Sequence, residues 1–375
     1  MNSPKKPTKA VDRRHMRVAL TLARRGLGNV WPNPAVGCVL VGADGSVVGR
    51  GWTQPGGRPH AETQALDQAG PKAKGSTAYV TLEPCSHHGK TPPCAEALIT
   101  AGVSRVVISI EDPDDRVSGR GATLLREAGI DVNLGVCADE AEAVNAGFLL
   151  HRTQGRPLVT LKTASTLDGR IATHSGQSQW ITGAAARQRG HLMRKTHDAI
   201  VVGIGTALVD DPELTCRLPG MAQDSPVRVV VDTRLQLPLE SKLVQTAKTV
   251  PTWIVVSSET MTERHKEYAA FGVEFIEVAP GADHHPEALS VLQALAARGL
   301  TRLLVEGGSA LSAVLLRAGL VDRLAWFRAP GAIGGDGIPV FAAYGVDQLS
   351  DMSRFVLETS ERVGKDTLET YRAAD

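Results

Sequence analysis

Apolar and polar residues in the first 150 positions follow patterns typical of alternating helices and strands. Between Asp12 and Arg25 the apolar residues recur every three or four positions, which predicts an amphipathic helix. Short apolar runs bounded by turn residues predict strands, and helical patterns separate most of them. Strands are expected at 35–41, 47–51, 77–82, 103–110 and 130–135, and further helices at 59–69, 121–128 and 139–155, with one beginning after Thr91. This alternation predicts an α/β layered sheet over roughly residues 10 to 145.

A second α/β pattern begins at Pro157, after a short connector over residues 152–156. It predicts strands at 157–164, 199–203, 227–231, 252–257, 273–278, 301–305 and 324–329, helices at 184–197, 286–297 and 309–318, and strands in the tail from Phe355. A chain of 375 residues is also longer than one typical domain. We therefore predict a disordered tail over residues 1–10, a first domain over 11–151 and a second domain over 152–375.

The composition excludes several classes of protein. A hydrophobic content of 42% and a charged content of 22% are those of an ordinary globular chain. The net charge of +1, without a long basic run, argues against a nucleic-acid partner. The polar N-terminus lacks the apolar core of a signal peptide, and no stretch approaches membrane-spanning length. Five cysteines in so long a chain do not make a disulfide framework, so we expect a reduced, cytoplasmic protein without a membrane partner.

The strongest chemical signal is His60-Ala61-Glu62, followed by Glu83-Pro84-Cys85 and then by Cys94. One imidazole and two thiolates leave room for a water, which predicts a catalytic rather than a structural zinc site. Zinc lowers the pKa of its bound water toward neutrality, and Glu62 is expected to carry a proton from that water to a departing amine. The pattern therefore predicts hydrolytic deamination of a heterocyclic amine. The alternative is a set of unrelated buried thiols and a surface histidine.

The spacing of these residues leads to two structural predictions. His60 and Glu62 would point to opposite sides of a regular helix, so His60 is expected at an irregular helix start. Thr91 is expected to cap the next helix, with two prolines in its first turn and Cys94 immediately after them. A helix N-terminus favours anions, so Cys94 would lie where a thiolate is stabilised.

Three features of the second half suggest a dinucleotide and a phosphorylated substrate. Gly307-Gly308 leads from a strand into a helix at Ser309, where backbone N–H groups and the helix dipole favour a phosphate. The segment 203–206 is too short for a dinucleotide fingerprint and indicates only a tight turn. Thr233 and Arg234 follow an apolar strand and could grip a ribose 2′-phosphate, which would favour NADPH over NADH. Gly-Gly turns are common in α/β proteins, and Arg234 is equally compatible with a surface charge.

The first half closely resembles the deaminase half of the bifunctional riboflavin-biosynthesis deaminase/reductase family. The resemblance rests on residues 32–38 (P-N-P-A-V-G-C), on H-A-E, and on the long spacing within Glu83 to Cys94, which separates this family from the cytidine and tRNA deaminases. It implies a cytidine-deaminase-like three-layer α/β domain. It also implies that His60, Cys85 and Cys94 are the zinc ligands and that Glu62 is the proton shuttle.

The same resemblance implies that Asn33 and Lys90 help to hold a pyrimidine ribosyl phosphate. The less favoured alternatives are that Asn33 is a turn residue between two prolines and that Lys90 is a solvated loop charge. One departure is visible, because many relatives carry a histidine after Gly51 where this chain has Trp52-Thr53. This leaves the substrate contact there open, whereas the metal ligands are unaffected.

The second half resembles the reductase half of the same family, which is dihydrofolate-reductase-like rather than Rossmann. The resemblance rests on 161–170, 178–183, Arg194, 205–212 and 306–308, and the two halves follow in the family's usual order. It implies an NADPH site formed by Ala164, Trp180, Thr206, Asp210, Gly308 and Ser309, to which the pattern described above adds Thr233. It implies a substrate site formed by Ser178, Arg194, Leu214, Arg217 and Glu306, since guanidinium groups bind phosphate well. Lys162 and Asp210 are candidates for proton transfer during hydride delivery, although Lys162 is equally compatible with an ordinary strand lysine.

Together these features predict two successive steps of riboflavin synthesis. The first domain, with Zn²⁺, would deaminate 2,5-diamino-6-(5-phosphoribosylamino)pyrimidin-4-one, and the second would reduce the ribosyl side chain to ribityl with NADPH. A reductase domain of this kind commonly pairs, so we expect a homo-oligomer, a dimer or higher.

Three alternatives stay open at this point. A nucleic-acid base deaminase should show a short C-x-x-C spacing and a basic surface, and this chain has neither. A zinc-stabilised binding module would not require Glu62, so its presence argues against that class. The third alternative is a deaminase whose second domain is inactive or acts on another substrate.

Overall fold

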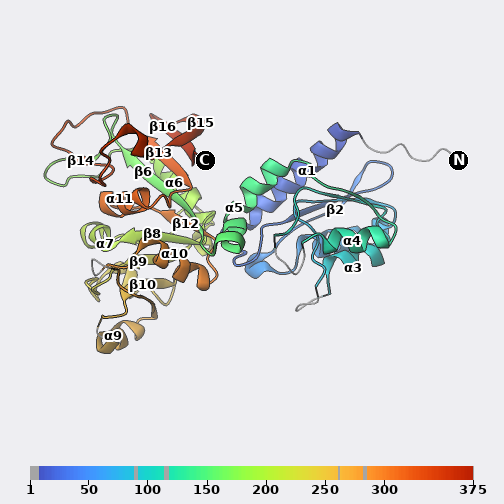
Figure 1. Cartoon of the computed structure of the whole chain (residues 1–375), viewed down its shortest axis with the longest axis horizontal. Coiled ribbons are helices and arrows are strands. Elements are labelled where there is room, and N and C mark those ends of the chain that lie inside the picture. Colours follow the sequence, from blue (N-terminus) through green and yellow to red (C-terminus); the bar gives the residue numbers. More distant parts are fainter. Residues whose placement is uncertain (1–7, 88–91, 114–117, 261, 282–284, 375) are drawn as a thin grey trace. The chain divides into compact units, whose positions relative to one another are not determined.

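The computed structural model describes residues 8–87, 92–113, 118–260, 262–281 and 285–374. The chain divides into two compact units, residues 1–154 and 155–375, and each is described by itself (Figure 1). A helix over Ala138–Gln154 carries the first unit three residues beyond the predicted boundary at 151. Among the described residues, no helix combines the length and apolar character needed to cross a lipid bilayer.

The first unit is built on a five-stranded sheet in the order β2-β1-β3-β4-β5. Its strands are β1 (Gly37–Val41), β2 (Val47–Trp52), β3 (Thr77–Val80), β4 (Arg105–Ile108) and β5 (Asp131–Asn133). β1 pairs with β2 and β3 in antiparallel fashion, whereas β3, β4 and β5 are parallel. The helices are α1 (Lys9–Ala23), α2 (Ala61–Ala69), α3 (Cys94–Thr100), α4 (Arg120–Glu127) and α5 (Ala138–Gln154).

Two glycines explain how helices cover both faces of this sheet. A Cβ atom on Gly37 would lie 1.9 Å from the Ala19 carbonyl oxygen of α1, and one on Gly51 would lie 2.1 Å from the Ala61 carbonyl oxygen of α2. Gly51 pairs with Cys38 in the ladder, so it faces the opposite side of the sheet from Gly37. α1 and α2 therefore pack directly on opposite faces, which makes the expected three-layer α/β arrangement.

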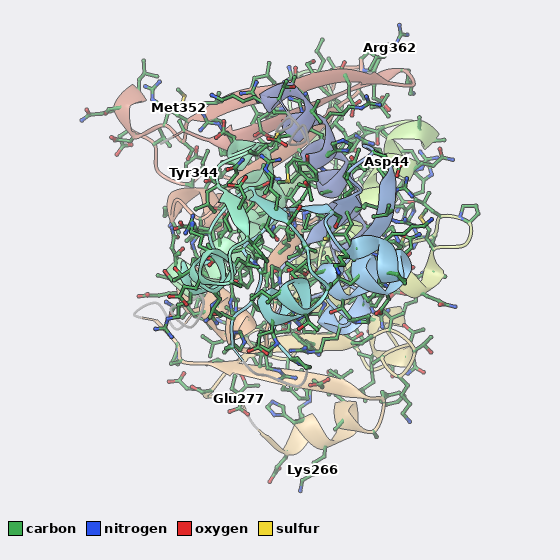
Figure 2. All side chains as sticks on the ribbon, turned by 90° about the vertical axis from the view of Figure 1, so that its right-hand side faces the viewer. Asp44, Lys266, Glu277, Tyr344, Met352 and Arg362 are labelled. Carbon is green, nitrogen blue, oxygen red and sulfur yellow. The ribbon has the colours of Figure 1, made fainter. Side chains whose placement is uncertain are left out.

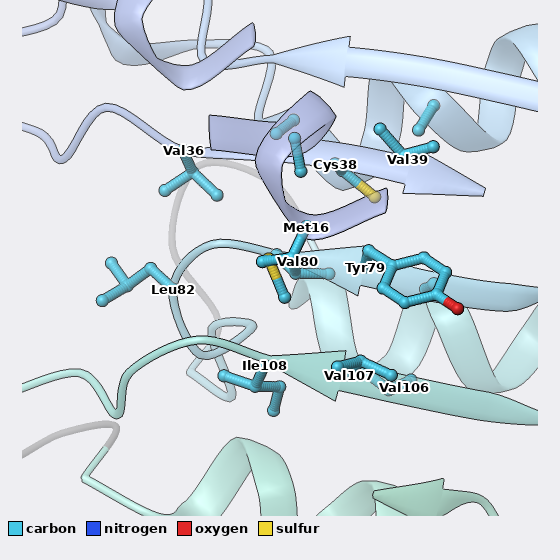
Figure 3. Packing of buried hydrophobic residues seen from close by; sticks show 14 of the residues in the cluster. Met16, Val36, Cys38, Val39, Tyr79, Val80, Leu82, Val106, Val107 and Ile108 are labelled. Carbon is cyan, nitrogen blue, oxygen red and sulfur yellow. The ribbon is translucent and has the colours of Figure 1, made fainter. Parts of the chain in front are cut away.

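The core of the first unit lies between the sheet and these helices, and it contains one buried polar network. Met16 of α1 and Ile108 of β4 are fully buried in this core (Figure 3). The Tyr79 hydroxyl donates to Asp12 at 2.9 Å, and Arg105 donates to both oxygens of the same carboxylate at 2.8 Å. These bonds satisfy charges that would be costly to bury alone, and they tie α1 to β3 and β4.

The second unit is built on a nine-stranded sheet in the order β11-β10-β9-β8-β12-β6-β13-β16-β15. The run from β11 to β13 is parallel, and β16 and β15 are added in antiparallel fashion. The strands are β6 (Leu158–Ser165), β8 (Ala199–Gly203), β9 (Val227–Val231), β10 (Thr252–Ser257), β11 (Val273–Val278), β12 (Arg302–Val305), β13 (Arg323–Arg328), β15 (Phe355–Val363) and β16 (Asp366–Ala373). The helices are α6 (Ala184–Lys195), α7 (Ile204–Asp210), α8 (Lys242–Gln245), α9 (His265–Ala269), α10 (Ala288–Ala297) and α11 (Ser309–Arg317).

Several elements differ from their predicted form. α1 begins at Lys9, inside the expected disordered tail, because the Thr8 hydroxyl accepts a hydrogen bond from the Val11 N–H and caps the helix. The expected tight turn at 203–206 is instead the start of α7. A small two-stranded sheet of β7 (Arg170–Ala172) and β14 (Ile338–Pro339) and the short helices α8 and α9 were not predicted, because each is too short to carry a periodic pattern.

Charged side chains extend outward from both units, as Asp44, Lys266 and Arg362 illustrate (Figure 2). This is the usual consequence of keeping solvated charges outside an apolar core.

Candidate functional site

Three elements of the first unit bring His60, Cys85 and Cys94 together. His60 immediately precedes α2, Cys85 follows β3, and Cys94 is the first residue of α3. The His60 Nδ1 atom lies 3.3 Å from the Cys94 Sγ atom and 3.7 Å from the Cys85 Sγ atom. The three ligand atoms all lie within 4.8 Å of one another. One imidazole nitrogen and two thiolate sulfurs at these separations fit a zinc ion with an open fourth position.

The local backbone explains this convergence. His60 has extended dihedral angles (φ −72°, ψ 161°) at the residue before α2, which confirms the expected irregular helix start. The expectation for the next helix is wrong in one respect, because α3 begins at Cys94 and Pro93 is extended before it. Thr91, the expected cap, lies outside the described residues. The Cys94 N–H, at the start of this helix, donates to the Cys85 sulfur at 3.3 Å, so the helix start stabilises the thiolate of Cys85.

The two thiols of this cluster differ, because their mutual hydrogen bond lowers the pKa of Cys85 and raises that of Cys94, so the stabilised thiolate is Cys85 and not the expected Cys94. Hydrogen bonds from Cys94 and His60 outweigh burial and lower the pKa of the Cys85 thiol to about 4. Burial and the nearby Cys85 thiolate raise the pKa of Glu62 to about 7. Glu62 is 3% exposed and lies in the first turn of α2. A carboxyl group with this pKa can both accept and donate a proton near neutral pH.

The cluster borders a cavity of about 210 Å³. Four of the residues expected in the deaminase site line it together: Asn33, His60, Glu62 and Cys85. The Asn33 amide packs directly against Gly57, since a Cβ atom on this glycine would lie 2.0 Å from the amide nitrogen. Lys90, the other expected substrate residue of this domain, lies outside the described residues.

Two further side chains position the walls of this cavity. The amide of Asn145 in α5 bonds with both the N–H (3.0 Å) and the carbonyl (3.1 Å) of Ala35, which pins the segment after Asn33. Glu83, just before the Cys85 ligand, accepts N–H bonds from Asp112, Gly119 and Ala122 at 3.0 to 3.2 Å. Its carboxylate therefore ties the metal-binding loop to the start of α4.

At the departure noted after Gly51, the hydroxyl of Thr53 is hydrogen-bonded to the backbone. It accepts from the Val36 N–H at 2.9 Å and donates to the Val36 carbonyl at 3.5 Å. Thr53 lines the cavity, whereas the Trp52 ring lies against the Arg25 guanidinium at 4.1 Å. Sequence reasoning gave no role to His87, which lies within the motif from Glu83 to Cys94. It also did not single out five other cavity residues, because no motif marks them: Arg58, Asp112, Phe148, His151 and Arg152.

A second cavity, of about 630 Å³, lies in the second unit. Eight residues predicted for the reductase line it together: Lys162, Trp180, Arg194, Thr206, Asp210, Leu214, Arg217 and Glu306. They come from β6, α6, α7, the end of β12 and the irregular segments around Trp180 and over 213–217. Three of these side chains are cationic (Lys162, Arg194 and Arg217) and two are anionic (Asp210 and Glu306), which suits a charged ligand such as a phosphorylated one.

The centre of this cavity is a carboxylate held by two cations. Val305, the last residue of β12, pairs with Leu161, so the register places the following Glu306 beside Lys162, with 3.6 Å between Nζ and Oε2. Arg194 of α6 donates to Glu306 through Nε at 2.7 Å and Nη2 at 2.9 Å. Burial by itself would raise the pKa of Glu306, but Arg194 and Lys162 outweigh it and lower the pKa to about 2. The carboxylate is therefore ionised throughout the physiological range.

Asp210 and Trp180 lie at the more open part of this cavity. Asp210 ends α7, and desolvation raises the pKa of its carboxyl. The Trp180 side chain is 67% exposed, and the Arg187 guanidinium stacks on its ring at 4.6 Å.

Five residues expected to contact cofactor or substrate do not line this cavity: Ala164, Ser178, Thr233, Gly308 and Ser309. Ser178 lines a neighbouring cavity of about 330 Å³, which also touches Trp180. Gly308 lies next to the cavity, because a Cβ atom on it would be 3.1 Å from the Thr206 hydroxyl oxygen. Four charged or titratable residues of the large cavity were missed: Arg187, His191, Glu213 and Lys242. The sequence did contain a signal for His191: it lies one helical turn before Arg194, so both side chains are expected on the same face of the predicted helix.

Comparison with known protein families assigns a class to each unit. Residues 9–110 match the model of the cytidine and deoxycytidylate deaminase zinc-binding region, and residues 157–368 match the model of the RibD C-terminal domain. The fold and the sites therefore define a bifunctional enzyme, in which a zinc-binding deaminase domain of cytidine-deaminase-like fold precedes a dihydrofolate-reductase-like reductase domain.

Relatives that match over nearly the whole chain identify the family. The riboflavin biosynthesis protein RibD of Bacillus amyloliquefaciens is 42% identical over 94% of both chains, and that of Escherichia coli K12 is 40% identical over 95% of this chain and 97% of its own. The solved structure of Acinetobacter baumannii RibD (form 1) is 38% identical and covers 98% of this chain and 100% of its own, with a TM-score of 0.88. The chain belongs to the RibD family. This confirms the predicted fold class and the predicted pairing of deaminase with reductase.

A second solved structure is named for both reactions. It is a diaminohydroxyphosphoribosylaminopyrimidine deaminase/5-amino-6-(5-phosphoribosylamino)uracil reductase from Thermotoga maritima. It is 36% identical and covers 98% of this chain and 99% of its own, with a TM-score of 0.85.

Proposed function

We propose that this enzyme deaminates 2,5-diamino-6-(5-phosphoribosylamino)pyrimidin-4-one and then reduces the ribosyl group of the product to ribityl with NADPH. The observation that carries the first step is that buried Glu62 shares a cavity with the zinc donors. The second step is supported by the second cavity, in which Lys162 and Arg194 flank Glu306. The names of the full-length relatives support this choice of substrate.

In the deaminase site, His60, Cys85 and Cys94 would hold zinc, which when bound supplies an activated water at neutral pH. Glu62 then takes up a proton from the attacking water and returns it to the departing amine, a task suited to its pKa of about 7. Asn33, which lines the same cavity, would orient the pyrimidine by hydrogen bonds. Lys90 stays a predicted contact to the ribosyl phosphate.

In the reductase site, NADPH supplies the hydride to C1′, and the protein positions the sugar and provides a proton. Lys162 and Asp210 are the proposed proton-transfer groups, because both line the cavity and can carry a proton. Arg194 already directs three of its N–H groups to Glu306 and to the Thr215 carbonyl. The half-exposed Arg217 is therefore the better placed guanidinium for the substrate phosphate.

The NADPH contacts are proposed for Ala164, Trp180, Thr206, Asp210, Thr233, Gly308 and Ser309, and the further substrate contacts for Ser178 and Leu214. The nearness of Gly308 to Thr206 supports a phosphate-binding turn at the start of α11. The homo-oligomer and the cytoplasmic location expected from the sequence stay predictions.

The test is to give zinc-loaded protein the diaminopyrimidinone ribosyl phosphate, with and without NADPH, and to follow the products by mass spectrometry. We expect exchange of an amine for oxygen without NADPH, and a gain of two hydrogens only with it. Glu62→Gln should abolish the first step alone, and Lys162→Ala should slow the second step alone. A protein that deaminates but never reduces the deaminated intermediate would contradict the second half of the proposal.

A further inference from the structure

The segment 213–217 carries two proposed substrate contacts but has no regular secondary structure. Leu214 adopts left-handed backbone dihedrals (φ +53°), a conformation that a non-glycine residue keeps only where its surroundings hold it. Its side chain is 3% exposed and packs in the core, and Arg228 donates to the Glu213 carbonyl at 3.2 Å. These contacts fix the beginning of the segment, but they do not reach Arg217.

His191 of α6 holds the other end of the segment. Its Nδ1 atom lies 3.1 Å from the Thr215 carbonyl oxygen and 3.3 Å from the Arg217 backbone nitrogen. In one neutral tautomer Nδ1–H donates to Thr215, and in the other Nδ1 accepts from the Arg217 N–H. The Cys216 thiol donates to the His191 carbonyl oxygen at 3.3 Å, so backbone and ring of this one residue both contact the segment.

The same contacts connect the segment to the charged centre of the cavity. Arg194, one turn after His191 on α6, donates to the Thr215 carbonyl at 2.9 Å and also binds Glu306. Burial and the neighbouring charges of Arg194 and Arg217 lower the pKa of His191, so the ring is neutral at physiological pH. Of the two neutral tautomers, the one protonated at Nε2 leaves on Nδ1 the lone pair that the Arg217 N–H requires.

We propose that His191 is a positioning residue of the reductase, which sets the place of Arg217 for the ribosyl phosphate through its Nδ1 atom. The inference rests on the proposed reductase function. It assigns to His191 an effect on the binding of the phosphorylated substrate and none on hydride transfer or on NADPH, since its hydrogen bonds go to the substrate-binding segment.

The experiment compares His191→Phe, which keeps the ring volume without nitrogen, with His191→Asn, whose amide can occupy the place of Nδ1. In steady-state reduction of the deaminated ribosyl phosphate by NADPH, we expect His191→Phe to raise the KM for this substrate about tenfold, the scale of one or two lost hydrogen bonds. The kcat and the KM for NADPH should stay within about threefold of the wild type, and His191→Asn should restore the KM. Arg189→Ala, on the exposed part of the same helix, is the matched control and should change neither constant.

A His191→Phe variant with the wild-type KM, or one that loses kcat at an unchanged KM, would overturn the inference while leaving the proposed reductase in place. If His191→Phe does not fold, judged by thermal unfolding, the same comparison between His191→Ala and His191→Asn decides the question. A wild-type enzyme that does not reduce the deaminated ribosyl phosphate would overturn the proposed function, and this inference with it.

Discussion

Replacing Glu306 with glutamine should destabilise the second unit strongly. The side chain is 8% exposed and binds Arg194 through two hydrogen bonds, with Lys162 at 3.6 Å. Its pKa of about 2, compared with an ordinary 4.5, corresponds to about 3 kcal/mol, since one pKa unit is about 1.4 kcal/mol. Glutamine keeps the shape but leaves two partly buried cations without their anion; breaking a fully buried pair typically costs about 3 to 5 kcal/mol, so we expect a loss of about 3 kcal/mol.

The assay is calorimetric unfolding, in which the second unit contributes its own transition. For a unit of this size, residues 155–375, a loss of about 3 kcal/mol should lower Tm by about 6 to 12 °C. The matched control is Glu361→Gln. Glu361 pairs with Arg189, which lies on the same helix as Arg194, but both side chains of this pair are nearly half exposed. An exposed pair contributes less than about 1 kcal/mol, so the control should stay within a few degrees of the wild type. A Glu306→Gln variant as stable as this control would refute the reasoning.

The effect has a defined dependence on pH. Because the pKa of Glu306 is lower in the folded than in the unfolded state, its contribution is complete above about pH 4.5 and is lost as the pH falls toward 2. The difference in unfolding free energy between the wild type and Glu306→Gln should therefore be constant near neutrality and shrink in acid. A difference that grew below pH 4 would show that the carboxylate is not held in its charged form.

Three further predictions concern the first unit. Gly57→Ala would place a Cβ atom 2.0 Å from the Asn33 amide and displace this side chain. The KM for deamination should therefore rise about tenfold or more, whereas reduction should be unchanged. An unchanged KM would argue against a role for Asn33. Gly121→Ala would place a Cβ atom 2.1 Å from the Pro84 carbonyl oxygen, beside the ligand Cys85. We expect the unfolding free energy to fall by about 1 to 3 kcal/mol and zinc to be retained less well. A variant with the Tm and zinc content of the wild type would contradict this. Removal of zinc by a chelator, verified by elemental analysis, should abolish deamination and spare reduction of the deaminated substrate, and metal-free deamination would refute the assignment.

The sequence by itself determined the order of the longer strands and helices in both units, because apolar periodicity is a local property. It also determined the metal chemistry, since His60, Cys85 and Cys94 lie close to recognisable element boundaries and carry the donor types that zinc prefers. Even the irregular helix start at His60 followed from the two-residue spacing to Glu62, which a regular helix cannot accommodate on one face.

Only the tertiary structure decided which residues distant in the sequence form an ion pair or a hydrogen bond. Glu306 and Arg194 are 112 positions apart, and their pairing depends on the register of β12 beside β6 and on how α6 packs. The link from His191 to Arg217 likewise depends on an irregular segment, whose path no periodicity encodes. Local pattern therefore identified the elements and the zinc donors, whereas long-range packing alone set the ionisation of Glu306 and the contacts that shape the reductase cavity.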